Sequence, residues 1–335
     1  MKNYLFVTTM SSIYYLAFPL IKKLKGEVYI VTQSNQVEKF FKEFTDCKII
    51  RTNVDQNFYN TKSIKENFLN IFRIRSEYKK LFKHIKESNI YFFGKSWRLT
   101  VFYHIQRLSK HNSVKLIDIK LNNVMKIKRG LYPFVLNLLT KLLLGIDVVI
   151  IERGNKDAFT LGSKFYMKNR IIVERHEKKR SKNKLALDVM NGKDVMYVLS
   201  GLVGCNHVDK RDYIETTDRI CSMLEKYFSG RYMIKPHYNE EEIYEVVDDN
   251  LLLPSYLPFE FLLDYPLKVV VGTASLALTI ASTSENKTIS LLHLFKYKDE
   301  EVKQYYKDWL NTESKDIIFP KTFDELEENI RSIIW

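Results

Sequence analysis

Cysteine is scarce in this chain of 335 residues. There are only three, Cys47, Cys205 and Cys221, an odd number without a CxxC spacing. This pattern argues against a disulfide framework and against a zinc site. A reduced, cytoplasmic protein is the simplest interpretation.

Long hydrophobic runs are also lacking. The longest apolar stretch, residues 131–151, is interrupted by Pro133, Lys141, Gly145 and Asp147, so it makes a poor membrane span. The N-terminal residues contain a short apolar run that polar residues break early, and we interpret them as a strand and a turn rather than a targeting segment. We therefore expect that no segment crosses a bilayer.

The charges are unevenly distributed. The chain is 45% hydrophobic and carries 53 Lys and Arg against 40 Asp and Glu, a net charge of +13. Residues 1–190 hold 37 of these basic residues and 15 of the acidic ones, a net charge of +22, which leaves −9 for residues 191–335. Such asymmetry favours two domains with different partners.

Short β-branched or aromatic runs alternate with helical patterns along most of the chain. This alternation predicts βαβ units around parallel sheets, hence an α/β fold. We expect a Rossmann-like domain at 1–175, a polar linker at 176–194 and a second Rossmann-like domain at 195–335, facing each other across a cleft as in the GT-B fold. The expected strands are 4–8, 28–32, 48–50, 90–93, 114–117, 148–151, 195–199, 232–234, 251–253, 269–271 and 288–292. The expected helices are 12–24, 35–44, 62–88 (one helix or a pair), 97–108, 132–144, 213–228, 240–246, 259–263, 275–282 and 323–334.

Three loops of the second half carry residues suited to a nucleotide. Lys235 and His237 follow one strand, and Glu260 lies in the first turn of a helix. In doubly wound sheets, ligands bind at the carboxyl ends of strands, and an acidic residue there can accept hydrogen bonds from a ribose. A satisfied histidine in a surface loop is the alternative for His237, and the helix dipole alone would explain Glu260.

The third loop joins a buried strand to a helix through Gly272, Thr273 and Ser275. The two hydroxyls and the backbone N–H groups at the helix start predict an anion site. A tight connection without a ligand is the alternative. Because the three loops follow strands of one predicted sheet, we expect them to converge at one edge.

The order of these loops, IKPHYNE, LPFEFLL and VVVGTASLAL, resembles the nucleotide-binding domain of the bacterial GT-B sialyltransferases, both lipooligosaccharide sialyltransferases and capsular polysialyltransferases. The resemblance is good over residues 195–292 and holds only in outline before them. It implies that His237 and Ser275 hold the departing phosphate of cytidine monophosphate (CMP), and that Glu260 binds the ribose. The family's His-Pro is here Pro236-His237-Tyr238, so the histidine is kept and the proline after it is not.

The general base of these families is an acidic residue at a strand end in the first domain. Asp118 and Glu152 are the candidates, although neither segment matches the family's pattern fully; an ordinary turn residue is the alternative for each. No Asp-x-Asp motif stands in the expected position, and Asp248-Asp249 precede a strand in a polar loop. We therefore expect no metal and no other cofactor, with the phosphate charge met by protein groups.

The basic first half predicts a partner of its own. Its clusters lack a helix-turn-helix, RNP or finger pattern, so no nucleic acid is expected. An anionic membrane surface that presents a lipid-linked acceptor fits better, with the amphipathic segment 62–88 as the contact. The cytoplasmic face of the inner membrane is the expected location, with the protein bound peripherally.

Together these features predict an inverting, metal-independent glycosyltransferase. It would move sialic acid, or a related nonulosonic acid, from its CMP-linked donor to a hydroxyl of a bacterial surface glycan, in lipopolysaccharide O-antigen, lipooligosaccharide or capsule biosynthesis. The alternatives are a GT-B enzyme that uses CMP-Kdo or a nucleotide-linked hexose, and a noncatalytic membrane- or nucleic-acid-binding protein on the same fold.

Overall fold

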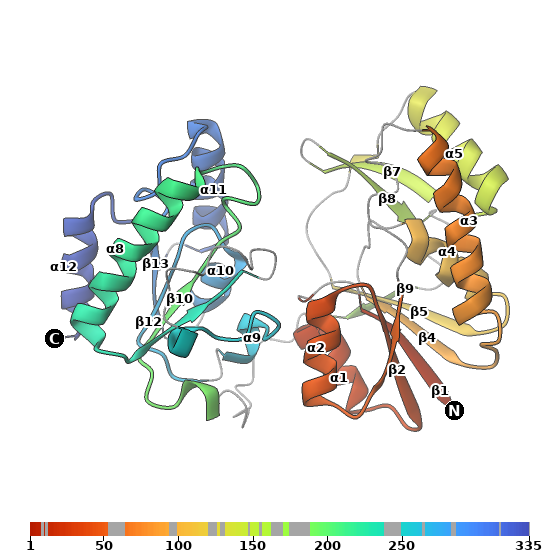
Figure 1. Cartoon of the computed structure of the whole chain (residues 1–335), viewed down its shortest axis with the longest axis horizontal. Helices are drawn as coiled ribbons and strands as arrows, with labels where there is room; N and C mark the ends of the chain where they lie inside the picture. Colours follow the sequence, from red (N-terminus) through yellow and green to blue (C-terminus); the bar gives the residue numbers. More distant parts are fainter. Residues whose placement is uncertain are drawn as a thin grey trace. The chain divides into compact units, whose positions relative to one another are not determined.

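The computed structural model divides into two compact units, Met1–Glu177 and Lys178–Trp335 (Figure 1). It describes residues 1–7, 10, 13–52, 64–93, 99–119, 126–127, 131–146, 148–153, 156–161, 170–173, 188–237, 249–262, 265–282, 286–314 and 316–334. Part of the expected linker, residues 188–194, packs with the second unit, because Met190 is fully buried and Asp194 pairs with Arg231 at 2.6 Å. The expected helix at 240–246 and the pair Asp248-Asp249 lie outside the described ranges, except for Asp249.

A six-stranded parallel sheet forms the centre of the first unit. Its strand order is β3-β2-β1-β4-β5-β9, and every neighbouring pair is parallel. With β9 as the sixth strand, this is the 3-2-1-4-5-6 order of the Rossmann fold. The strands are β1 (Lys2–Phe6), β2 (Glu27–Thr32), β3 (Lys48–Arg51), β4 (Asn89–Phe93), β5 (Ser113–Ile119) and β9 (Arg170–Val173).

Helices connect these strands, as the alternating pattern predicts. They are a π-helical turn η1 (Ile13–Ala17), α1 (Phe18–Ile21), α2 (Asn35–Phe44), α3 (Ile64–Leu81), α4 (Leu99–Leu108) and α5 (Leu131–Leu144). In the core between α3, α4 and the sheet, the buried His104 ring lies 2.9 Å from the Glu77 carboxylate and 4.7 Å from the Phe82 ring centroid. Burial lowers the pKa of His104, which favours a neutral imidazole that is hydrogen-bonded to Glu77 inside the core.

One sequence prediction for this unit is wrong. The run 148–151 was expected to join the parallel sheet, but β7 (Val148–Arg153) lies in a separate antiparallel sheet between β6 (Lys126–Ile127) and β8 (Lys156–Leu161). An apolar β-branched run indicates a strand without indicating its partner. The sixth place in the parallel sheet belongs to β9, which the sequence pattern did not single out.

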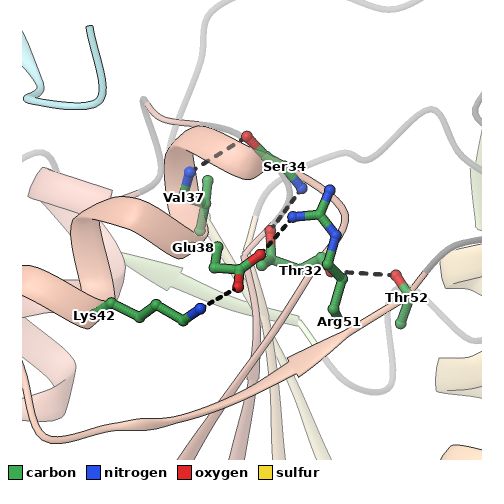
Figure 2. Close-up of polar contacts among 7 residues, drawn as sticks. All are labelled: Thr32, Ser34, Val37, Glu38, Lys42, Arg51 and Thr52. Carbon is green, nitrogen blue, oxygen red and sulfur yellow. Dashed lines mark hydrogen bonds and ion pairs between the residues drawn. The ribbon is translucent and has the colours of Figure 1, made fainter. Parts of the chain in front are cut away.

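Polar contacts fix the carboxyl edge of this sheet where β2 leads into α2 (Figure 2). The Ser34 hydroxyl caps α2 by accepting a hydrogen bond from the Val37 N–H at 3.3 Å. The Glu38 carboxylate lies between Lys42, at 2.6 Å, and Arg51, at 2.5 Å. Hydrogen bonds from Lys42 and then Arg51 hold the pKa of Glu38 below its ordinary value, so this carboxylate stays ionised and suits an ion pair rather than proton transfer.

The second unit repeats the architecture. Its parallel sheet has the order β11-β10-β12-β13-β14, formed by β10 (Val195–Val198), β11 (Tyr232–Lys235), β12 (Val269–Gly272), β13 (Lys287–Ser290) and β14 (Ile317–Ile318). The expected strand 251–253 is a short 3₁₀ turn, η3 (Asp249–Leu251), followed by a parallel bridge from Leu252 to Ile234 of β11. Counting that bridge, the order is again 3-2-1-4-5-6, and the predicted class of two Rossmann-like α/β units is confirmed.

Helices accompany the strands of this sheet. They are α8 (Lys210–Phe228), α9 (Phe259–Leu262), α10 (Leu276–Ser282), α11 (Glu300–Glu313) and α12 (Phe323–Ile334). Of these, α8 and α12 share one core with the sheet. The last helix packs on α8: Leu326 and Ile330 join the core that includes Leu224, and Glu327 pairs with Lys226 at 2.7 Å. Within the ranges described above, no helix has the length and apolar character needed to cross a membrane.

Candidate functional site

The ends of three neighbouring strands lie level in the second sheet. Val198, the last residue of β10, is in register with Lys235 at the end of β11 and with Gly272 at the end of β12. The loops that follow these strands therefore start at one edge; the loops after β11 and β12 were predicted to lie together there, whereas the loop after β10 was not singled out. The strand order reverses between β10 and β12, and Rossmann folds bind ligands at this reversal, outside the carboxyl ends of the strands.

His237 rests against Gly201 at this edge. A Cβ atom on Gly201 would lie 2.9 Å from Cε1 and 3.0 Å from Nδ1 of the imidazole, so any other residue would push the ring away. Our sequence interpretation missed Gly201 and its neighbour Ser200. The available signal was a Ser-Gly pair directly after the strand 195–199, a position that favours close backbone approach.

A hydrogen bond between two hydroxyls joins the loop after β10 to the loop after β12. The hydroxyls of Thr273 and Ser200 are hydrogen-bonded at 2.5 Å and both are buried. The Ser290 hydroxyl in turn donates to the Thr273 carbonyl oxygen at 2.7 Å. Thr273 was predicted to bind a donor; the contact that the structure gives its hydroxyl ties the end of β12 to the end of β10, and the donor contact stays a prediction.

Gly272 and Ser275 complete the third loop. A Cβ on Gly272 would lie 3.0 Å from the Val198 carbonyl oxygen and 3.3 Å from Leu278 Cδ2, so this glycine permits close packing of strand and helix. The half-buried Ser275 hydroxyl accepts a hydrogen bond from the Ala277 N–H at 3.2 Å. Ser275 therefore starts the seven-residue α10, and its hydroxyl proton remains available to a ligand.

Lys235 was predicted to bind the donor, and that contact stays a prediction. The Lys235 side chain is buried, and its ammonium donates to the carbonyl oxygens of Pro236, at 2.9 Å, and Ser255, at 3.1 Å. Burial lowers the pKa of Lys235 to about 7, although the charge of Glu260 acts in the opposite direction. These contacts make Lys235 a residue that joins the loop after β11 to the segment before α9.

Glu260 is also buried, in the first turn of α9. Its charge acts on Lys235, so the two predicted donor-binding residues lie near each other inside the unit. The predicted contact between Glu260 and a ribose stays a prediction.

The surroundings of His237 favour its neutral form near pH 7. Burial, and then the charge of Lys235, lowers the pKa of His237 to about 4. A neutral imidazole carries one N–H, the group through which His237 would contact the phosphate that the resemblance implies. A bound phosphate anion would raise the pKa again, because an opposite charge favours the protonated ring.

A pH-dependent stability is expected from Lys235. In the unfolded chain this group keeps its proton up to its ordinary pKa of 10.5, whereas in the folded chain it loses the proton above about 7. The unfolded state therefore holds more protons between these values, and this group makes folding more favourable as pH rises. The Lys235→Met variant has no ammonium at this position and therefore lacks this rise in stability with pH. We expect the difference in unfolding free energy between wild type and variant to move in favour of the wild type by on the order of 3 kcal/mol between about pH 7 and about pH 9.5.

Urea unfolding of both proteins across this range measures that difference. Lys193→Met is the matched control, because the Lys193 ammonium also donates to a backbone carbonyl, Gly230 O at 2.7 Å, but is only half-buried. If the difference in unfolding free energy between wild type and Lys235→Met stays constant with pH, the lowered pKa of Lys235 is wrong.

The two candidate bases lie in different sheets of the first unit. Asp118 is the second-to-last residue of β5, at the carboxyl edge of the parallel sheet and in register with Ile172 of β9. Glu152 is in register with Lys126 and Asp157 in the antiparallel sheet. Each residue is the second-to-last of its strand, but only Asp118 lies at the carboxyl edge of a parallel sheet, so the role of base stays a prediction for both.

In the part of the chain that the structure describes, no group of three or more His, Cys, Asp or Glu is placed to hold a metal ion. The expected independence from metal stays a prediction.

No family model and no curated protein matches the chain. Among solved structures, it is similar to the UDP-GlcNAc 2-epimerase of Methanocaldococcus jannaschii in complex with UDP-GlcNAc and UDP, with 12% identity and a TM-score of 0.48 over 100% of this chain and 93% of that one. It is also similar to MurG of Acinetobacter baumannii (8% identity, TM-score 0.37, 100% and 92% covered). A third similar structure is the wall teichoic acid polymerase TagF with CDPG (9% identity, TM-score 0.40, 99% and 87% covered). All three TM-scores are below 0.5, so the fold class is assigned from the strand orders of the two parallel sheets. The chain consists of two Rossmann-like units, and proteins of the GT-B fold are also built from two such units.

Proposed function

We propose that this chain is a glycosyltransferase whose second unit holds a nucleotide-linked sugar donor. The observation that carries the proposal is the meeting of the loops after β10, β11 and β12, where His237 packs on Gly201 and Thr273 bonds to Ser200. These contacts join three separate loops at the edge where Rossmann folds bind nucleotides. The first unit would bind the acceptor, in keeping with its different charge.

The finer proposal is a CMP-linked sialic acid, or a related nonulosonic acid, as donor and a bacterial surface glycan as acceptor. Its support is the ordered resemblance of IKPHYNE, LPFEFLL and VVVGTASLAL to the bacterial sialyltransferases. The histidine and the serine of those motifs both follow level strand ends of one sheet.

In the proposed reaction, an acceptor hydroxyl oxygen attacks the anomeric carbon of the donor sugar with inversion. The bond from that carbon to the phosphate oxygen breaks, and its electron pair leaves with CMP. The hydroxyl proton passes to a carboxylate of the first unit, Asp118 or, as the alternative, Glu152. The N–H of His237 and the hydroxyl of Ser275 would stabilise the charge that grows on the leaving phosphate.

Thermal unfolding in the presence of nucleotides tests the donor. At 100 times its dissociation constant, a ligand of the folded state stabilises by about 2.7 kcal/mol. For a unit of this size, CMP should then raise the melting temperature of the second unit by roughly 5–10 °C, whereas uridine diphosphate should leave it unchanged.

An equal shift with both nucleotides, or a shift with uridine diphosphate alone, would assign the donor to another class. The proposal of a transferase is tested separately by incubation with CMP-sialic acid and a panel of bacterial glycans. Release of no CMP above the rate of hydrolysis with any acceptor would favour a noncatalytic binding protein.

A further inference from the structure

Helix α5 of the first unit presents large apolar side chains to solvent. Leu131 is 79% exposed, Phe134 65%, Leu138 45% and Leu142 71%. Their spacing of three, four and four residues places them on one side of the helix, where they form a continuous stripe. We call these four residues the α5 stripe.

The inward side of the same helix is partly polar. Thr140 and Leu144 are buried and Asn137 is half-buried, while Lys141 is exposed beside the α5 stripe. A surface helix ordinarily turns its apolar side chains toward the core. Among the side chains that the structure describes, the polar Asn137 and Thr140 are covered and four large apolar ones are exposed, so the α5 stripe suits an apolar environment outside the unit.

Cationic side chains surround the C-terminal end of α5. Arg75 of α3 donates to the Leu143 carbonyl oxygen, and Arg107 of α4 donates to the Leu144 carbonyl oxygen at 3.0 Å. These contacts place α3 beside α5, as the ribbons also show (Figure 1). Among the α3 side chains that the structure describes, Arg73, Arg75, Lys79 and Lys80 are exposed cations.

The charge of the whole unit has the same sign. Residues 1–177 carry 32 Lys and Arg against 14 Asp and Glu, a net charge of +18, and α5 itself contains no acidic residue. An apolar helix face with cations beside it is the pattern of helices that lie in the interface of a membrane with anionic lipids.

We propose that α5 docks on an anionic lipid bilayer, with the α5 stripe inserted at the boundary between headgroups and acyl chains. Lys141 and the exposed cations of α3, Arg75 among them, would contact lipid phosphates around the α5 stripe. A second copy of the chain fits this surface less well, because two units that each carry +18 would repel one another. The inference does not depend on which nucleotide sugar the second unit binds.

The proposed membrane contact is α5, whereas the sequence pattern placed it in residues 62–88. There, basic residues alternate with apolar ones and indicate an amphipathic helix, whereas the segment 131–144 is apolar nearly all round. Sequence alone therefore suggests a buried helix for α5. In the structure α3 supplies flanking charge, and α5 supplies the apolar side chains.

Sedimentation with lipid vesicles tests the proposal on the full-length protein. Wild type should bind vesicles of mixed phosphatidylglycerol and phosphatidylcholine and bind pure phosphatidylcholine at least tenfold more weakly, because each cation near an anionic surface contributes to affinity. The double variant Leu138→Glu, Leu142→Glu should lose at least tenfold in binding to the mixed vesicles, since it places carboxylates in the inserted stripe.

Tyr305→Glu is the matched control, because Tyr305 is 67% exposed on α11 of the second unit. It should bind vesicles as wild type does. Circular dichroism and thermal unfolding without nucleotide verify that each variant is folded, and Leu138→Ser, Leu142→Ser provides a second test without added charge. Vesicle binding by both double variants equal to wild type, or no binding by wild type, would overturn the proposal. It would also be overturned by light scattering that finds a wild-type dimer which the double variants convert to monomer.

Discussion

Replacement of His237 by alanine is expected to lower the turnover number by roughly 10²–10³-fold, the effect of removing one donor that stabilises transition-state charge. The ring is held in place by packing on Gly201, where a Cβ would lie 2.9 Å from Cε1. It is neutral near pH 7 because burial and the charge of Lys235 lower its pKa to about 4. The N–H that it offers costs little reorganisation as the phosphate leaves. Initial rates of CMP release, with CMP-sialic acid and an acceptor, measure the effect.

Two further variants separate the ring's chemistry from its position. Gly201→Ala keeps the imidazole but displaces it, and should cost about tenfold or more, since small displacements from productive geometry are costly. His111→Ala removes an exposed imidazole at the opposite, amino edge of the first sheet and should retain full turnover. Retained turnover in His237→Ala would remove this residue from the mechanism.

The protonation of His237 gives an independent readout. Because a phosphate anion favours the protonated ring, the pKa of His237 should rise from about 4 when CMP binds. Binding then takes up a proton in the interval between the free and bound values. An NMR titration of the imidazole Cε1–H signal, with and without CMP, follows the change directly, and an unchanged pKa would contradict contact with the phosphate.

Asp118→Asn is expected to lower transfer by roughly 10²–10⁴-fold, the usual contribution of a general base, while CMP binding stays intact. The amide has the same shape but cannot accept the hydroxyl proton. Rates of transfer and the CMP-induced thermal shift, measured on the same preparation, test both parts of the expectation. A large loss of CMP binding would show that Asp118 acts on the donor instead.

Placement in the first unit favours Asp118 over other acidic residues there. It lies at the carboxyl edge of the parallel sheet, whereas Glu152 lies in the antiparallel sheet. Glu38 is also near that edge, but it is bound to Lys42 and Arg51 (Figure 2). Glu152→Gln is the matched comparison and should retain most of the activity. Loss of transfer in Glu152→Gln with full activity in Asp118→Asn would reverse the assignment.

The sequence alone determined the α/β class of both units and the edge of the second sheet at which the candidate site lies, although not every strand of either sheet. Alternating strand and helix patterns predicted parallel sheets, and helix α2 begins and ends at the predicted residues, 35 and 44. The grouping of His237, Thr273 and Ser275 was also predictable. Connections that return to the same end of a parallel sheet place successive loops at one edge, whatever the details of side-chain packing.

The tertiary structure decided where His237 packs, how Lys235 is bonded and which face of α5 is exposed. Three features depend on residues that approach each other only on folding. They are the pairing of β7 with β8, the contact of His237 with Gly201 and the hydrogen bond from Lys235 to the Ser255 carbonyl oxygen. The outward turn of the α5 stripe was equally hidden, because a helix that is apolar nearly all round does not indicate which side packs inward. Strand partners and burial are set by contacts between distant segments, and local sequence patterns do not encode them.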